Sequence, residues 1–153
     1  MLQVGDPIPS DARVWLTPRE RLTLGELGAV GPMLLLFYLF DWSDVCTAEV
    51  ELLRDYKAEL DAAGVRPFGI SRDSPWTHIA WNQVLELNFP LISDWNAEAA
   101  EGFGIARDFF GFGDVPERSA FLIDGNGTVR ATWLYGTDEG PDIDALLSAA
   151  RAL

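Results

Sequence analysis

The chain contains a single cysteine, Cys46, whose position suits a reactive thiol. It falls in the first turn of an expected long helix that Ser43 or Asp44 caps. The unpaired N–H groups and the positive dipole end of a helix N-terminus favour an anion such as a thiolate. Two interpretations follow: Cys46 is a redox nucleophile, or it is a small buried hydrophobe, as most lone cysteines are.

The helix terminus alone does not make a strong nucleophile. An ordinary thiol, with a pKa of about 8.5, is only a few per cent ionised at pH 7. Lowering such a pKa to about 6 requires roughly 3.4 kcal/mol of preferential thiolate stabilisation. A helix terminus supplies about 0.3 to 1 kcal/mol, and up to about 2 when partly buried. A reactive Cys46 therefore requires an arginine partner as well.

The counts of other reactive residues narrow the chemistry. One cysteine excludes an intramolecular disulfide and a multi-cysteine metal site, and it fits a reducing compartment. The single histidine, His78, removes the usual Cys–His pair and argues against zinc. We expect neither a metal nor an organic cofactor. His78 itself is more simply interpreted as a surface or packed side chain than as a functional one.

Composition limits the partners and the location. The net charge of −13 argues against nucleic acid and anionic membrane surfaces, both of which need a basic patch. The longest apolar run, 33–40, is too short for a membrane span, and the N-terminus lacks a signal-peptide pattern. We expect a cytoplasmic protein whose 153 residues form one domain, 1–153.

The elements that must position Cys46 follow from apolar periodicity and turn residues. The patterns predict strands at 14–16, 22–24, 33–40, 65–71, 89–92, 119–124 and 128–134. They predict helices from 43 or 44 to 63, at 75–87, at 96–103 and from Pro141 onward. Gly125-Asn126-Gly127 is a hairpin signal between the last two strands. This order predicts an α/β fold of thioredoxin-like type, with a mixed sheet covered by helices on both faces.

The residues around Cys46 add a resemblance. Segment 37–49, Phe-Tyr-Leu-Phe-Asp-Trp-Ser-Asp-Val-Cys-Thr-Ala-Glu, resembles the active-site segment of the peroxiredoxins. It is most similar to one-cysteine members of the alkyl hydroperoxide reductase and thiol-specific antioxidant group. Four further segments, 4–7, 69–75, 89–94 and 116–124, match the family in the same order.

The resemblance implies a thiol peroxidase that reduces hydrogen peroxide or organic hydroperoxides. Cys46 would attack the peroxide and become a sulfenic acid, and Ser43 would hydrogen-bond the thiolate and the peroxide. Arg118 would stabilise the thiolate and polarise the O–O bond, and Glu49 would orient Arg118. The simpler alternatives are a plain helix cap for Ser43, a surface arginine for Arg118 and a solvated glutamate for Glu49.

Two features depart from the family pattern or leave it incomplete. Leu39 replaces the motif proline, which shields the cysteine and lacks a competing N–H. No second cysteine is present to resolve a sulfenic acid, so the resemblance implies an external thiol. That thiol is a low-molecular-weight thiol, a mycoredoxin- or glutaredoxin-like protein, or thioredoxin. The alternative function is a weakly active or non-enzymatic peroxide sensor or interaction module.

Several aromatic residues have open roles. Trp42, Trp76 and Trp81 lie near segments through which such proteins dimerise, which implies a homodimer, with core packing as the alternative. The aromatic segment 109–113 is interpreted as a glycine-bearing loop. It either lines an apolar pocket, forms a dimer contact or packs in the core.

Overall fold

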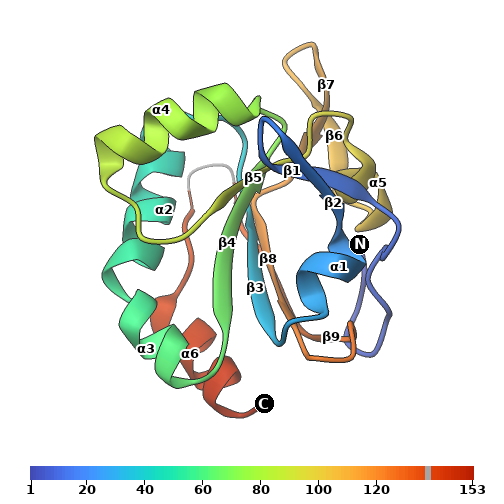
Figure 1. Cartoon of the computed structure of the whole chain (residues 1–153), viewed down its shortest axis with the longest axis vertical. Coiled ribbons are helices and arrows are strands. Elements are labelled where there is room, and N and C mark those ends of the chain that lie inside the picture. The colour runs from blue at the N-terminus through green and yellow to red at the C-terminus, as the bar shows by residue number, and fades with distance from the viewer. Residues whose placement is uncertain (137–138) are drawn as a thin grey trace.

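The computed structural model describes residues 1–136 and 139–153 and is built around one mixed sheet (Figure 1). Its seven strands run in the order β2-β1-β5-β4-β3-β8-β9. Their bounds are β1 Arg13–Thr17, β2 Glu20–Thr23, β3 Met33–Phe37, β4 Arg66–Ser71, β5 Leu91–Ser93, β8 Ser119–Ile123 and β9 Val129–Leu134. The central strands β3, β4 and β5 are parallel, whereas β8 pairs antiparallel with β3 and β9 antiparallel with β8. The predicted mixed sheet is therefore confirmed.

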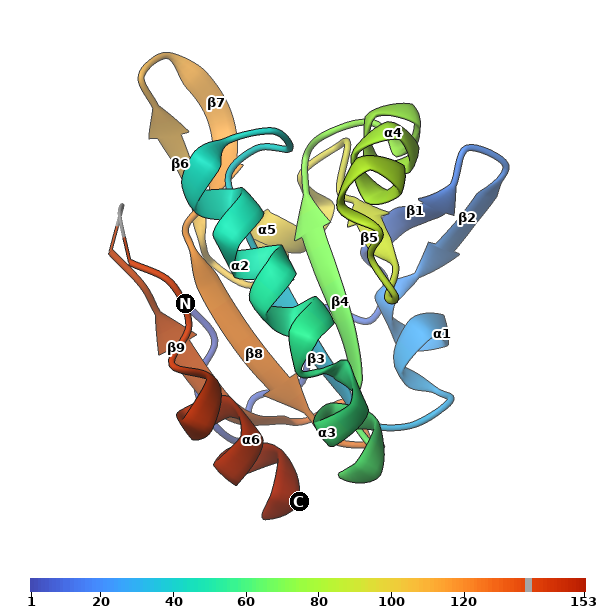
Figure 2. The same ribbon diagram turned by 90° about the vertical axis from the view of Figure 1, so that its left-hand side faces the viewer.

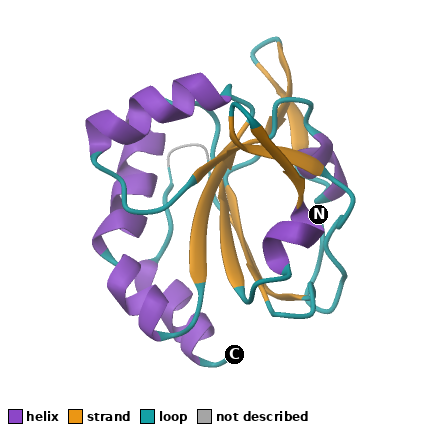
Figure 3. Ribbon diagram, viewed as in Figure 1, coloured by secondary structure: helices purple, strands orange, loops and turns teal. Residues whose placement is uncertain are grey.

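Helices cover both faces of this sheet, as expected (Figure 3). One face carries four helices, seen in front of the strands in Figure 2: α2 Asp44–Asp55, α3 Lys57–Ala62, α4 Pro75–Leu85 and α6 Ile143–Arg151. The other face carries α1 (Leu24–Gly28) and α5 (Glu98–Gly102) (Figure 1). No helix in the described part of the chain is long and apolar enough to cross a bilayer.

Strand β3 divides the hydrophobic core into two halves. All five of its residues are buried, because it lies in the middle of the sheet. Side chains alternate between faces along a strand, so Leu35 and Phe37 pack with α1 and α5, whereas Leu34 and Leu36 pack under α2 and α4. Cys46 belongs to the second half of the core.

Strand β3 ends three residues earlier than predicted. It stops at Phe37, and the chain then turns through Tyr38 to Trp42 before α2 begins. Trp42 has a positive φ of 73°, which a strand residue cannot have and which a bulky side chain rarely adopts. The apolar run of residues 33–40 did not reveal this turn, because Leu39 and Phe40 face a cavity and an aromatic cluster instead of extending the sheet.

The predicted long helix is divided into α2 and α3. Tyr56 leaves helical geometry, with φ −111° and ψ 13°, and separates the two segments. The expected apolar stripe still holds, since Val50, Leu53 and Leu60 are buried. Gly64 follows with φ 77°, the left-handed conformation that ends a helix.

The sequence patterns did not predict three elements, strands β6 and β7 and helix α1. Segment 109–113, interpreted as a loop, belongs to a hairpin of β6 (Ala106–Phe109) and β7 (Phe112–Pro116). Its two turn residues, Phe110 and Gly111, both have positive φ, at 50° and 90°. Such turns strongly favour Asn-Gly, so a phenylalanine hid the signal. Helix α1 begins at Leu24, although the sequence pattern predicts a strand at 22–24. Its capping box of Thr23 and Glu26 was visible in the sequence.

Candidate active site

The start of α2 holds Cys46 in place. Ser43 is the N-cap, and its Oγ accepts the backbone N–H of Cys46 at 3.4 Å. Thr47 donates its hydroxyl to the Ser43 carbonyl at 2.8 Å, which ties the first turn together. The side chain of Cys46 points inward and is fully buried. The cap interpretation of Ser43 is thus observed directly, and the thiol lies at the positive end of the helix.

Arg118 reaches the thiol from the neighbouring strand. It immediately precedes β8, whose first residue, Ser119, pairs with the last residue of β3, Phe37. The loop that leaves β3 leads directly to α2, so this register brings positions 46 and 118 together. Arg118 Nη1 donates to Cys46 Sγ at 3.2 Å, and the arginine is only 5% exposed. The alternative of a surface arginine is therefore wrong.

Glu49 lies one helical turn beyond Cys46 and contacts the same guanidinium. Arg118 Nη1 donates to Glu49 Oε1, so Arg118 links the sulfur and the carboxyl group. Glu49 is 1% exposed, and the alternative of a solvated glutamate is wrong. Burial raises the pKa of Glu49 to about 7, although Arg118 opposes that rise. Near neutral pH Glu49 is therefore only partly ionised, and it shares the Arg118 guanidinium with the Cys46 sulfur.

A cavity of about 260 Å³ opens beside Arg118. Leu39, at the motif-proline position, is 8% exposed and forms part of its wall. The rest of the wall is mostly apolar and includes Phe109, Val115, Pro116, Leu134 and Tyr135. One of the expected roles for segment 109–113, the lining of an apolar pocket, therefore holds for Phe109. This arrangement offers space for a small polar group at Arg118 and for an apolar substituent beside it.

A buried polar network anchors the loop before Ser43, and sequence reasoning missed it. His78 Nδ1 lies 2.7 Å from Asp41 Oδ2, and His78 Nε2 lies 3.1 Å from the Ile92 carbonyl. The Ile92 carbonyl can only accept a hydrogen bond, so Nε2 carries a proton, and Nδ1 shares a hydrogen bond with the Asp41 carboxyl group. Tyr38 donates its hydroxyl to Asp41 Oδ1 at 2.6 Å. His78 is packed, as expected, and it forms a buried ion pair.

The carboxyl group of Asp73 completes the network. It accepts the backbone N–H of Asp41 at 2.9 Å and the Ser71 hydroxyl at 2.6 Å. Burial, and secondly the charge of Asp41, raises the pKa of Asp73. No local sequence signal links these residues, because Asp41 and His78 are 37 positions apart.

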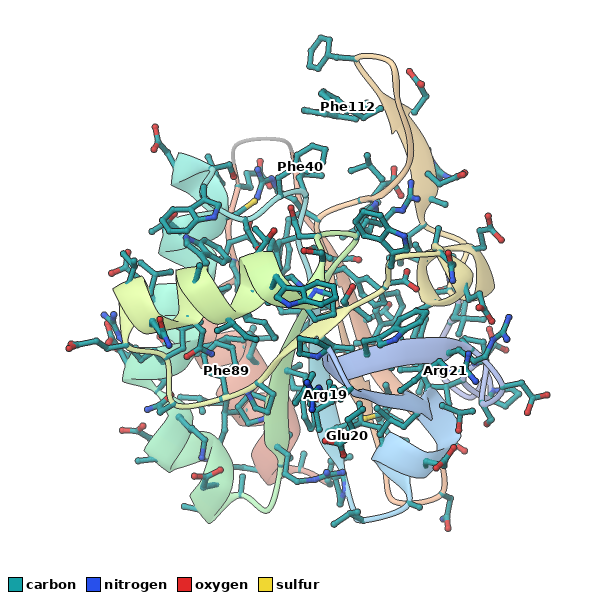
Figure 4. All side chains as sticks on the ribbon, turned by 45° about the horizontal axis from the view of Figure 1, so that its top comes forward. Arg19, Glu20, Arg21, Phe40, Phe89 and Phe112 are labelled. Carbon is teal, nitrogen blue, oxygen red and sulfur yellow. The ribbon has the colours of Figure 1, made fainter. Side chains whose placement is uncertain are left out.

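The remaining aromatic residues separate into core and surface. Trp81 is 1% exposed and packs on Tyr38, so it is a core residue. Trp42 and Trp76 are 51% and 67% exposed. Figure 4 shows Phe112 on the projecting β6–β7 hairpin close to Phe40, and their ring centroids are 5.2 Å apart. Phe110, at the hairpin tip, is 89% exposed.

The site offers the chemistry of a thiol beside a guanidinium. Cys46 supplies a buried sulfur, Arg118 supplies a fixed positive charge that contacts it, and the cavity gives an approach to Arg118. In the described part of the chain, no group of three or more His, Cys, Asp or Glu side chains could hold a metal ion.

Comparison with known families and proteins finds that this chain is similar to peroxiredoxins. The model of the AhpC/TSA family matches residues 4–132. A putative peroxiredoxin bcp of Coxiella burnetii is 37% identical over 117 residues, which cover 74% of this chain and 77% of that protein. A peroxiredoxin of Pyrococcus horikoshii is 32% identical over 119 residues, 74% of this chain. The match covers only 54% of the Pyrococcus protein, so the chain spans about half the length of that relative.

Solved structures have the same architecture. Peroxidoxin BcpB of Mycobacterium tuberculosis superposes with a TM-score of 0.87 at 26% identity, covering 100% of this chain and 99% of that one. The bacterioferritin comigratory protein of Xanthomonas campestris, described for its alkyl peroxide reduction activity, gives a TM-score of 0.82 at 26% identity and covers 97% of both chains. The thioredoxin-like fold expected from the order of elements is therefore confirmed.

Proposed function

We propose, from the premise that this chain belongs to the AhpC/TSA family of peroxiredoxins, that it is a one-cysteine thiol peroxidase. The observation that carries this proposal is the 3.2 Å hydrogen bond from Arg118 Nη1 to the Cys46 sulfur. A buried guanidinium that donates to sulfur adds the stabilisation of a thiolate that a helix terminus alone is too weak to supply.

The first half-reaction is a two-electron transfer from sulfur to the peroxide. The Cys46 thiolate attacks the terminal oxygen of a hydroperoxide, ROOH, so that an S–O bond forms and the O–O bond breaks. Sulfur becomes a sulfenic acid and the peroxide is reduced to RO⁻, which takes a proton from solvent and leaves as an alcohol or as water. Arg118 stabilises the thiolate and polarises the O–O bond. Ser43, the helix cap, also hydrogen-bonds the bound peroxide.

The second half-reaction needs two equivalents of an external thiol, because Cys46 is the only cysteine. One thiol condenses with the sulfenic acid to give a mixed disulfide and water. The second thiol displaces Cys46 and leaves as the oxidised donor. We propose that the donor is a low-molecular-weight thiol, a mycoredoxin- or glutaredoxin-like protein, or thioredoxin. We also propose that the protein acts in the cytoplasm as a homodimer of single-domain chains.

The cavity favours organic hydroperoxides as well as hydrogen peroxide. Its wall carries Leu39, Phe109 and Leu134, against which an alkyl group can pack while the peroxide group meets Arg118. The bacterioferritin comigratory protein of Xanthomonas campestris, described for its alkyl peroxide reduction activity, supports the same choice.

Rapid mixing with peroxide tests the proposal. Trp42 immediately precedes the Ser43 cap, so oxidation of Cys46 should change tryptophan fluorescence in a stopped-flow experiment. We expect a second-order signal and a mass increase of one oxygen atom, both absent in Cys46→Ser. If the parent protein gives neither, it is not a thiol peroxidase.

A peroxide sensor is the second candidate, favoured by the full burial of Cys46 and by Leu39 at the proline position. Consumption of peroxide with each class of thiol donor separates the two functions. A sulfenic acid that forms but is not turned over with any of the donors indicates a sensor. Sustained consumption indicates the enzyme.

A further inference from the structure

Two buried polar atoms close to the thiol have no hydrogen-bond partner among the described residues. They are Oε2 of Glu49 and the hydroxyl of Tyr135. A buried polar atom left unpaired costs roughly 1–3 kcal/mol, so such atoms are rare without a functional reason. Glu49 already has a role through its other oxygen, which accepts from Arg118. The hydroxyl of Tyr135 has none.

The sheet places Tyr135 directly beside Arg118. Leu134 pairs with Ser119 across β8 and β9, so Tyr135 and Arg118 are the next opposed pair. The Tyr135 N–H donates to the Arg118 carbonyl at 2.9 Å. Opposed residues of an antiparallel pair project from the same face, with Cβ atoms roughly 5 Å apart. Both side chains accordingly line the same cavity.

Burial and nearby negative charge keep the Tyr135 hydroxyl protonated. Burial raises the pKa of Tyr135, and the nearby carboxylates of Glu49 and Asp142 raise it further. At neutral pH the side chain is therefore a donor of one hydrogen bond. Glu49 also contacts Arg118, the residue that lies opposite Tyr135 in the sheet and donates to the Cys46 sulfur.

We propose that the Tyr135 hydroxyl is a further catalytic group, which donates a hydrogen bond to the leaving oxygen of the peroxide. This inference rests on the proposed peroxidase function. Attack by Cys46 on the terminal oxygen directs the other oxygen away from sulfur, toward the cavity that Arg118 and Tyr135 line. Negative charge develops on that oxygen as the O–O bond breaks, and a fixed donor aimed at developing charge accelerates such a step. Tyr135 keeps its proton, and solvent protonates the departing RO⁻.

Tyr135→Phe removes only the hydroxyl and therefore tests its role directly. We expect the second-order rate of sulfenic acid formation to fall about tenfold to a hundredfold, near the lower range for loss of one such donor. The urea midpoint should stay the same or rise, since an unpaired buried group is removed. Alkylation of Cys46 by iodoacetamide should be unchanged, because the Arg118–Cys46 contact remains. Tyr56→Phe, another partly buried tyrosine that packs on the same core half, is the matched control and should change none of these rates.

A comparison of two peroxides with different leaving groups tests the role of the Tyr135 hydroxyl more specifically. A peracid expels a stable carboxylate that needs little help, whereas tert-butyl hydroperoxide expels a basic alkoxide. The loss in Tyr135→Phe should therefore be several times larger for tert-butyl hydroperoxide than for peracetic acid.

Three results would overturn the inference: an unchanged peroxide rate, equal losses for both peroxides, or a parallel fall in urea midpoint and alkylation rate. The last would assign Tyr135 a structural role. Failure of the peroxidase proposal itself looks different, because the parent protein would then show no Cys46-dependent oxidation.

Discussion

At the scale of residues, the charge of the site depends on how Cys46 and Glu49 share the Arg118 guanidinium. Arg118 contacts both the Cys46 sulfur and the Glu49 carboxyl group in a buried position. If both of these groups are ionised, one cation serves two anions and the cluster carries a net negative charge, which burial disfavours. Protonation of Glu49 leaves Arg118 to the thiolate.

Removal of Arg118 should reduce the thiolate fraction of Cys46. Arg118→Ala alone would leave Glu49 buried without a cation, so the variant is best made in a Glu49→Gln background. We expect the initial rate of iodoacetamide alkylation at pH 7 to fall at least about tenfold relative to Glu49→Gln, because only the thiolate reacts. Equal rates in the two proteins would mean that Arg118 does not stabilise the thiolate.

Glu49 should make stability depend on pH. Its pKa in the folded protein, about 7, lies above the ordinary value of 4.5, so the folded state binds the proton more tightly than the unfolded chain does. The corresponding stability is fully present below pH 4.5 and is lost as the pH rises through 7. The rise of the Glu49 pKa from 4.5 to about 7 sets an upper bound of about 3.4 kcal/mol on this contribution.

Urea unfolding of the parent and of Glu49→Gln at pH 5 and pH 8 measures this effect. Asp94, whose pKa burial raises to about 6, adds a dependence of the same sign in both proteins. The difference between the two proteins therefore isolates Glu49: the parent should lose more stability than Glu49→Gln on going from pH 5 to pH 8. The same loss in both would contradict the prediction.

At the scale of elements, buried contacts of Asp41 with His78 and Tyr38 fix the turn between β3 and α2. Trp42 sits at a positive φ directly before the Ser43 cap, a conformation that costs roughly 1–2 kcal/mol for a residue with a side chain. The Asp41–His78 ion pair and the Tyr38 hydroxyl fix the preceding residue of this turn. Cys46 therefore lies in the first turn of a helix that follows a strained backbone turn, and α4 anchors that turn through His78.

Breaking this ion pair should destabilise the fold. His78→Ala leaves the Asp41 carboxylate buried and unpaired, and we expect the free energy of unfolding to fall by about 3 kcal/mol or more. The double variant Asp41→Asn/His78→Gln removes both charges, keeps groups able to hydrogen-bond, and should lose less. Urea denaturation at pH 7 compares them. A His78→Ala protein as stable as the parent would show that the pair contributes nothing.

At the scale of the whole molecule, exposed tryptophans favour self-association and the net negative charge opposes it. The chain carries a net charge of −13, yet Trp42, Trp76 and Trp95 are each more than half exposed. Trp76 and Trp95 line a hollow with Trp15, Pro18, Ser74 and Pro75. Exposed clusters of large apolar side chains mark interaction surfaces.

The proposed homodimer gives a direct prediction about mass. Light scattering after size exclusion should give twice the 16.9 kDa of the chain, and Trp76→Ser should shift the mass toward the monomer. Salt should favour the dimer, because it screens repulsion between two acidic chains. A parent protein that stays monomeric in 0.5 M salt, roughly five times the ionic strength that gives a 10 Å Debye length, would contradict the dimer.

The sequence by itself determined what depends on neighbours along the chain. The alternation of apolar residues predicted the central strands, and the Ser43 cap three residues before Cys46 predicted the helix start that holds the thiol. The turns at Trp42 and at Phe110-Gly111 were not predicted, because tryptophan and phenylalanine rarely adopt positive φ.

Only the tertiary structure decided which distant groups share the buried site. Arg118 meets Cys46 across 72 positions because β8 pairs in one register with β3. The same sheet brings Tyr135 beside Arg118. The resemblance to a family suggested Arg118 in advance, but nothing in the chain's local pattern pointed to Asp41 or Tyr135. Strand register, which no local propensity specifies, sets these distances, and burial then sets the charge of each group.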